Sequence, residues 1–201
     1  MKRTLIAAGI FSVIAVVTVW VAFASGSRDA GAAETQAEAR QHDAEAVAEL
    51  LRSVGIQPYS GPQRRIDFDL ENLAEESRSL SDYRGRLLFL NFWATWCPPC
   101  IEEMPSMQRL SDQLLGEGLT MVAVNVQEGR DDIRPFVDEL GLTFEILLDR
   151  RGQTGQAYGV RGLPTTVLLD RQGYVLGTKL GFAIWDDPQV VQALRDVLQE
   201  I

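Results

Sequence analysis

The chain has 201 residues, 46% of them apolar, and its 19 Lys and Arg residues are outnumbered by 28 Asp and Glu residues, which gives a net charge of −9. A chain of this length and composition buries one core of about 140 residues and has a leader to spare. The acidic balance argues against nucleic acid as a partner, because phosphates require a basic surface.

Cysteine and histidine are scarce. Cys97 and Cys100 are the only cysteines, and the single histidine, His42, lies within the first 58 residues. The body of the chain therefore lacks the ligands of a Cys/His zinc or copper site, and it lacks the base of a Cys–His or Ser–His catalytic pair. We expect the chemistry to depend on the two cysteines, with no metal or other cofactor.

Residues 1–24 predict export. Lys2 and Arg3 precede an apolar run over residues 5–24, and twenty helical residues span about 30 Å, the thickness of a bilayer core. Positive charge at the short end predicts a membrane anchor with its N-terminus inside and the body in the periplasm or extracytoplasmic space. The alternative is a cleaved signal peptide that ends at the small-x-small sequence of residues 22–24.

Residues 25–58 form a predicted tether rich in Ala, Glu, Gln and Arg. Its apolar residues recur at the i, i+3, i+4 and i+7 spacing of one short amphipathic helix: Val47, Leu50, Leu51 and Val54. We expect this stripe to pack on its own domain, which is predicted to cover residues 59–201. The alternative is a helix that dimerises or docks a partner.

The body alternates strands and helices. Continuous apolar runs predict strands buried on both faces, while Pro or Asp at the start and Gly at the end mark helices. In chain order we expect strands at 65–70, 87–92, 119–126, 144–148, 165–169 and 174–180, and helices at 98–115, from a cap at Asp131 or Asp132 to 140, at 154–158 and at 187–201. The fold class is α/β, a mixed sheet with helices on both faces.

The two cysteines lie where the strand 87–92 passes into the helix that begins at Pro98 and Pro99. This places Cys97 at a helix N-terminus, where free N–H groups and the helix dipole favour the thiolate that attacks disulfides. We expect Cys97 to be open to attack. Cys100, one turn later, is expected to be shielded and to resolve a mixed disulfide from behind.

A structural disulfide is the alternative for this pair. On the chain-entropy model, so short a loop stabilises the fold by only about 2 kcal/mol, against about 3 kcal/mol for a 15-residue loop. The pair is therefore poorly placed as a covalent staple, and a redox function is favoured.

The sequence LNFWATWCPPC at residues 90–100, with Glu103-Met104-Pro105 behind it, resembles the TlpA/ResA-like branch of membrane-tethered thioredoxin-fold proteins. The similarity runs from about Gln57 to the C-terminus. It implies a thioredoxin-like fold with an extra helix and strand between Asp131 and Leu148.

The same resemblance predicts a second part of the site at Gly162-Leu163-Pro164. Pro164 matches the cis-proline that faces the two cysteines in this family, which leaves the backbone of Leu163 free to pair with a substrate peptide. From the sequence alone, an ordinary turn before a buried strand is the alternative. Trp96 is expected at the rim that meets a partner.

Glu103 is a candidate proton acceptor, because it lies three residues after Cys100 and therefore on the same face of the helix, whereas Glu102 is expected to be solvated. Burial would raise its pKa and let it take the proton of Cys100. The alternative is an exposed first-turn glutamate that stabilises the helix dipole. Other thioredoxins carry a buried Asp at the position of Asn91, so the acid–base role is expected at Glu103.

The resemblance implies a reductant of disulfides in exported clients, such as apocytochrome c or copper-centre proteins, that is re-reduced by a membrane thiol carrier. Pro98 and Pro99 offer no N–H to Cys97, which also favours a reducing protein. The alternatives are a disulfide-forming oxidant and a Sco-like copper chaperone, although no histidine follows His42. A peroxidase is a further alternative, but the threonine expected three residues before a peroxidatic cysteine is absent, because Thr95 lies two residues before Cys97.

Overall fold

The structure, a computed structural model, describes residues 41–201, of which Ala46–Ile201 form one compact unit. This unit is built on a sheet of eight strands in the order β1-β8-β7-β4-β5-β6-β2-β3. Within residues 41–201 no helix is long and apolar enough to cross a bilayer. The predicted anchor at residues 1–24 lies outside the described residues.

Three parallel strands form the middle of the sheet: β4 (Leu87–Trp93), β5 (Leu119–Val126) and β6 (Glu145–Asp149). All seven residues of β4 are buried, as its continuous apolar sequence predicts. On its other side β4 pairs antiparallel with β7 (Thr165–Leu169), so the sheet is mixed and the predicted α/β class is confirmed.

The outer strands are short, except for β8 (Val175–Leu180), which pairs with β7. One edge is β1 (Gln57–Pro58), and the other is the hairpin of β2 (Asp69–Asn72) and β3 (Ser77–Ser79).

The predicted strand at 65–70 is wrong in its bounds, since β2 begins only at Asp69. The Arg64 carbonyl accepts a hydrogen bond from the Val175 N–H at 2.9 Å, and Arg65 forms an isolated bridge with Tyr174. These bonds hold residues 64 and 65 beside β8 and not beside β3.

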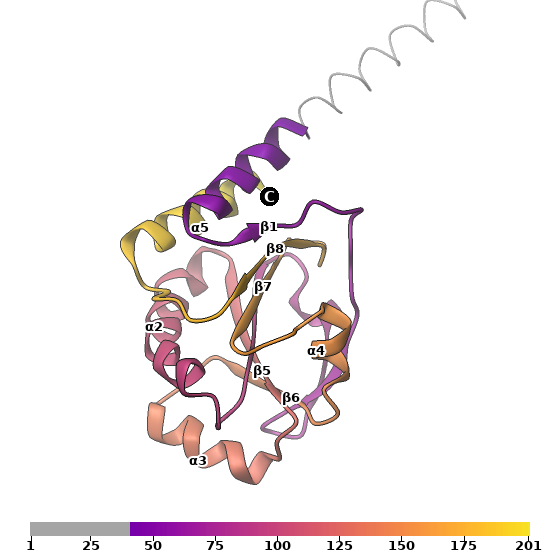
Figure 1. The fold of residues 1–201 in the computed structure, drawn as a ribbon, viewed down its shortest axis with the longest axis vertical. Helices are drawn as coiled ribbons and strands as arrows, with labels where there is room; N and C mark the ends of the chain where they lie inside the picture. The colour runs from indigo at the N-terminus through magenta and orange to yellow at the C-terminus, as the bar shows by residue number, and fades with distance from the viewer. Residues whose placement is uncertain (1–40) are drawn as a thin grey trace, which may run out of the picture. The chain divides into compact units, whose positions relative to one another are not determined.

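Helices cover both faces of the sheet. The core on one face contains residues of α2 (Pro98–Leu114), α3 (Arg130–Leu140) and α5 (Pro188–Glu200), and the core on the other contains Tyr158 of α4 (Gln153–Tyr158). Figure 1 shows α2 and α4 on opposite sides of the strands. Two short 3-10 helices, η1 (Leu80–Tyr83) and η2 (Leu115–Glu117), precede β4 and β5.

The helix caps match the sequence in part. Asp187 caps α5 and accepts the Gln189 N–H at 2.8 Å, as its position before a proline predicts. The cap of α3 is Gly129 and neither of the predicted aspartates. The Asp132 carboxylate instead reaches back and accepts the Gly129 N–H at 3.3 Å, so it stabilises the helix start from inside the first turn.

The compact unit begins earlier than the predicted boundary at Tyr59. Residues 41–53 are helical, and Val47, Leu51 and Ile56 are buried in the same core as α2 and α5. The stripe predicted in the tether therefore packs on its own domain. Directly after this helix, strand β1 pairs with β8 at the edge of the sheet.

Gly177 on β8 allows this close approach. A Cβ atom at this position would lie 2.9 Å from the Gln57 carbonyl, 3.0 Å from Ile56 Cγ2 and 3.1 Å from Leu51 Cδ1. Only a residue without a side chain lets this segment lie so close to β8.

We predict that Gly177→Ala lowers the free energy of unfolding by about 1–3 kcal/mol, since the added methyl group overpacks this contact. Gly116→Ala is the matched control, because its Cβ would meet nothing within 4 Å. Urea unfolding of the two variants measures the difference. Equal stability would contradict the packing of residues 51–57 on β8.

Candidate active site

The chain passes from β4 directly into the cysteines. The Cys97 N–H donates to the Ala94 carbonyl at 3.2 Å, and α2 begins at Pro98 with Cys97 as its N-cap. Cys97 and Cys100 form a disulfide, with their Cα atoms 5.3 Å apart. The predicted placement of the pair between a buried strand and a helix start is confirmed.

Both cysteines are buried. Cys100 is fully buried, and Cys97 is 4% exposed. Cys97 packs into the apolar core beneath α2, so the expectation of a Cys97 that is open to attack is wrong for the disulfide form.

Few N–H groups are available to Cys97 at the start of α2. Pro98 and Pro99 have none, and the Cys100 N–H donates to the Cys97 carbonyl at 3.0 Å. The helix dipole still favours an anion here, but hydrogen bonds that would stabilise a thiolate are few.

Glu103 lies on the buried face of α2 and is 1% exposed, so the alternative of an exposed first-turn glutamate is wrong. Its carboxylate accepts hydrogen bonds from Asn91 Nδ2 at 2.8 Å, from the Ala183 N–H at 3.2 Å and from Trp185 Nε1 at 3.2 Å. Burial raises the pKa of Glu103 to about 7, although these bonds and the charge of Lys179 act in the opposite direction.

Asn91 connects this carboxylate to the sheet. Its Nδ2 atom also donates to Thr166 Oγ1 at 3.0 Å, across the β4–β7 ladder in which Asn91 and Thr166 are paired. The sequence marked Asn91 only as a departure from other thioredoxins. Its contact with Glu103, twelve residues away, depends on how α2 packs on β4 and has no signal in the sequence.

The second predicted element lies beside the first. The pairing of Phe92 with Thr165 places Leu163 and Pro164 next to the end of β4, from which the chain runs to the cysteines. The Leu163–Pro164 peptide bond is cis, as predicted. The Pro164 carbonyl accepts the Gly181 N–H at 2.8 Å, whereas within residues 41–201 the backbone of Leu163 has no hydrogen-bond partner.

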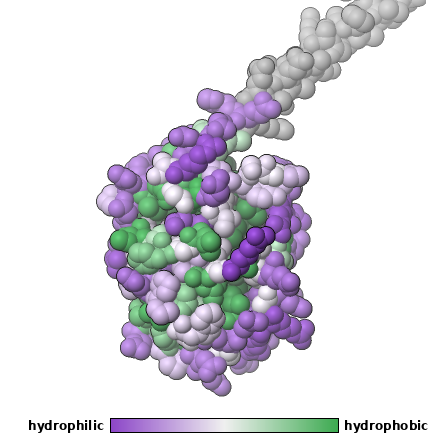
Figure 2. Space-filling model, in the orientation of Figure 1, coloured by the Kyte–Doolittle hydropathy of each residue, from purple (hydrophilic) through white to green (hydrophobic). Residues whose placement is uncertain are grey.

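Exposed apolar side chains occur close to these elements. Trp96 is 67% exposed, and Leu180 at the end of β8 and Phe182 and Ile184 on the segment that follows it are also exposed. Leu180 lies against Gly162, and Ala183 binds Glu103, so this segment borders the site. Figure 2 shows further apolar patches between polar residues on the face in view.

Glu128 is a site residue that the sequence analysis missed. Its carboxylate accepts the Thr95 N–H at 2.7 Å and Asn125 Nδ2 at 2.6 Å, and it also accepts the Thr95 hydroxyl. Glu128 thereby holds the turn that leads to Cys97. The only signal for it was an acidic residue shortly after the end of β5.

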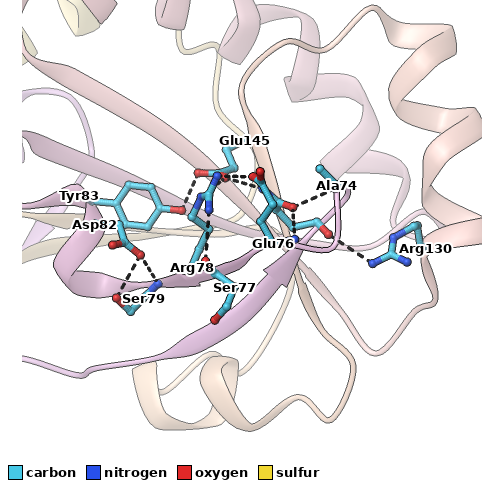
Figure 3. Close-up of polar contacts among 10 residues, drawn as sticks. Ala74, Glu76, Ser77, Arg78, Ser79, Asp82, Tyr83, Arg130 and Glu145 are labelled. Carbon is cyan, nitrogen blue, oxygen red and sulfur yellow. Dashed lines mark hydrogen bonds and ion pairs between the residues drawn. The ribbon is translucent and has the colours of Figure 1, made fainter.

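A second polar cluster lies at the β2–β3 edge of the sheet (Figure 3). Glu145 on β6 accepts hydrogen bonds from the Tyr83 hydroxyl at 2.6 Å, from Arg78 Nε at 2.9 Å and from Asn72 Nδ2 at 3.1 Å. Burial raises the pKa of Tyr83, so its hydroxyl stays a donor. These groups satisfy one another, and we interpret the cluster as the attachment of the hairpin to β6.

Across residues 41–201 no three His, Cys, Asp or Glu side chains are grouped so that they could hold a metal ion.

The sequence matches the AhpC/TSA family over residues 63–177. The thiol-disulfide oxidoreductase ResA of Geobacillus thermodenitrificans is 47% identical over 109 residues, which make up 54% of this chain and 63% of ResA. The chain thus spans less than two thirds of that relative. The thioredoxin-like protein YneN of Bacillus subtilis is 40% identical over 133 residues, 65% of this chain and 75% of YneN.

Solved structures share the fold. A putative thiol:disulfide interchange protein DsbE from Chlorobium tepidum superposes with a TM-score of 0.63 at 33% identity, over 69% of this chain and 98% of that chain. A secreted thiol-disulfide isomerase from Corynebacterium glutamicum gives a TM-score of 0.61 at 27% identity, over 71% of this chain and 92% of that chain. The chain has a thioredoxin-like fold and belongs to the AhpC/TSA family.

Proposed function

We propose that this protein is a thiol-disulfide oxidoreductase that reduces disulfides in exported client proteins. The observation that carries the proposal is a Cys97–Cys100 disulfide at the start of α2, one turn before the buried carboxyl of Glu103, in a core against which Leu163 packs with its backbone unpaired. The names of ResA and of the DsbE structure agree with this chemistry.

The first step uses Cys97, which is the less buried of the two residues. In the reduced protein, the Cys97 thiolate attacks one sulfur of a client disulfide, which forms a mixed disulfide and releases the other client sulfur as a thiolate. The free N–H and carbonyl of Leu163 are suited to pair with an extended client segment, as an added strand does. Trp96 and Leu180 offer apolar contact to its side chains.

The second step uses the buried sulfur. Cys100 attacks the Cys97 sulfur, which restores the intramolecular disulfide and releases the second client sulfur. The Cys100 thiol must lose its proton for this attack, and Glu103 is the buried base one turn further along α2. A pKa of about 7 suits a group that accepts a proton near neutral pH and then returns it to solvent.

The direction of electron flow follows from how weakly the Cys97 thiolate is stabilised. A strongly oxidising dithiol has a well-stabilised thiolate. Here Pro98 and Pro99 supply no N–H, and the Cys100 N–H is bonded to a backbone carbonyl. The dithiol form is therefore stabilised little relative to the disulfide, and we expect the protein to act as a reductant of client disulfides.

The compartment, the clients and the electron donor rest on the leader and on the resemblance to ResA. The apolar run at residues 5–24 would hold the domain on the outer side of the cytoplasmic membrane. A reductant in that place would serve apocytochrome c or copper-centre proteins, and a membrane thiol carrier would re-reduce it.

We predict that Cys100→Ser accumulates a covalent adduct with a client in cells, because Cys97 still attacks but the mixed disulfide is not resolved. Cys97→Ser is the matched control and should yield no adduct. Non-reducing electrophoresis and mass spectrometry of the adduct measure both. Adducts that form with Cys97→Ser and not with Cys100→Ser would reverse the assignment of the attacking sulfur, and equal amounts would contradict a single attacking sulfur.

We predict that Glu103→Gln slows the attack of Cys100 on a mixed disulfide roughly 10²-fold at pH 7. In the unmodified chain the rate should rise as pH passes about 7, where the carboxylate forms, and this rise should vanish in the variant. Release of thionitrobenzoate from a Cys97 adduct measures the step. The exposed neighbour Glu102→Gln is the control, and a Glu103→Gln profile identical to it would exclude the proton-acceptor role.

We predict a reduction potential close to that of thioredoxin, at about −270 mV, and far from strongly oxidising enzymes at about −120 mV. Equilibration of the full chain with glutathione or dithiothreitol buffers, followed by thiol alkylation, measures it. A value near −120 mV would mean that the protein forms disulfides.

A further inference from the structure

The side-chain oxygen of Asn91 is a buried acceptor without a donor. Asn91 is fully buried, and its Nδ2 atom is bonded to both Glu103 and Thr166, but its Oδ1 atom has no hydrogen-bond partner. Buried polar atoms are nearly always paired, so this oxygen calls for an explanation. A flipped amide gives none, because it would leave the side-chain NH₂ group unpaired in place of the oxygen.

The position of Asn91 limits which donor could reach it. Side chains alternate along β4, so Asn91 shares its face with Phe89 and Trp93, and both belong to the apolar core that contains Cys100. The bond from Nδ2 to Glu103 places the amide against α2, one turn beyond Cys100. The unpaired oxygen therefore lies in the apolar layer between β4 and the first turns of α2.

Trp93 Nε1 is another buried group in this core without a hydrogen-bond partner, so in the disulfide form it is not within reach of the Asn91 oxygen. Reduction of the cysteines adds a new donor to the layer. In the disulfide neither sulfur carries a hydrogen. A dithiol reductant breaks the Cys97–Cys100 bond by transferring two electrons and is itself oxidised to a disulfide. Cys97 is then a thiolate, and Cys100 takes one of the two protons of the reductant and is a thiol. The other proton goes to solvent. The S–H of Cys100 is then a new buried donor in the core that contains the neighbours of Asn91 on this face of β4, Phe89 and Trp93.

We propose that Asn91 Oδ1 accepts the S–H of reduced Cys100, so that one amide holds the thiol through its oxygen and the Glu103 carboxylate through its nitrogen. Asn91 is then a positioning residue for the resolving step. The inference rests on the proposed function, because the reduced dithiol is the working state of that reaction.

The bond exists only in the reduced protein and therefore stabilises the dithiol relative to the disulfide. Its loss should shift the equilibrium with glutathione about fivefold toward the disulfide. A structural role of Asn91 would change the stability of the fold in both redox states and would leave this equilibrium in place.

The experiment uses the fact that the full chain has two cysteines. In the Cys97→Ser chain, Cys100 is the only thiol, so the S–H stretching band in the infrared spectrum reports this group alone. We expect the band at the lowered frequency of a thiol bonded to an amide oxygen. Adding Asn91→Leu, which is similar in volume but has no acceptor, should move the band to the frequency of a free thiol.

One further variant sharpens the test. Asn125 carries another buried Oδ1 without a partner, so Asn125→Leu is the matched control and should leave the band in place. A band that moves with Asn125→Leu, or that moves in neither leucine variant, would overturn the assignment.

The frequency in the Cys97→Ser chain is a test that holds even if Asn91→Leu does not fold. A free-thiol frequency there rules out the hydrogen bond. No client enters either measurement, so an unshifted band refutes the role of Asn91 while adduct trapping by Cys100→Ser still succeeds. Failure of trapping with a lowered band instead refutes the proposed function.

Discussion

The burial of one carboxyl group beneath the first turns of α2 is the constraint on which the site depends. Glu103 is removed from water and is held by donors from three places: Asn91 on β4, the backbone of Ala183 and the indole of Trp185. Such a group is tolerated only where donors are supplied for it. The contacts that satisfy it also fix α2, and with it the cysteines, against the sheet and the segment after β8.

The chemistry of the site follows from an uneven distribution of donors. The carboxylate of Glu103 receives three hydrogen bonds, whereas the start of α2 offers few to Cys97, because Pro98 and Pro99 replace two amides. The turn before Cys97 is held separately by Glu128. The site therefore combines hydrogen bonds that fix α2 and the turn before Cys97 with few donors for a Cys97 thiolate, as the proposed reducing function requires.

Local patterns predicted most of the fold. Strands β5 and β7 have the bounds of their apolar runs, and Asp187 caps α5 as expected. An apolar run and an Asp-Pro helix start are both patterns of neighbouring residues, so they can be recognised in the sequence. The β2–β3 hairpin was missed, since its turn depends on Asn72, whose Oδ1 accepts the N–H groups of Ala74 and Glu76. The roles of Asn91 and Glu128 escaped for a related reason: their partners come together only through packing.

The two edges of the sheet have a consequence for how this domain meets other polypeptides. β1 has two residues, one of which is Pro58 without an N–H, and β3 has three residues, with the charged Arg78 at its centre. Strands so short offer almost no ladder for another polypeptide to extend. Another polypeptide close to this domain thus finds almost no edge strand to extend, and self-assembly by strand addition is suppressed.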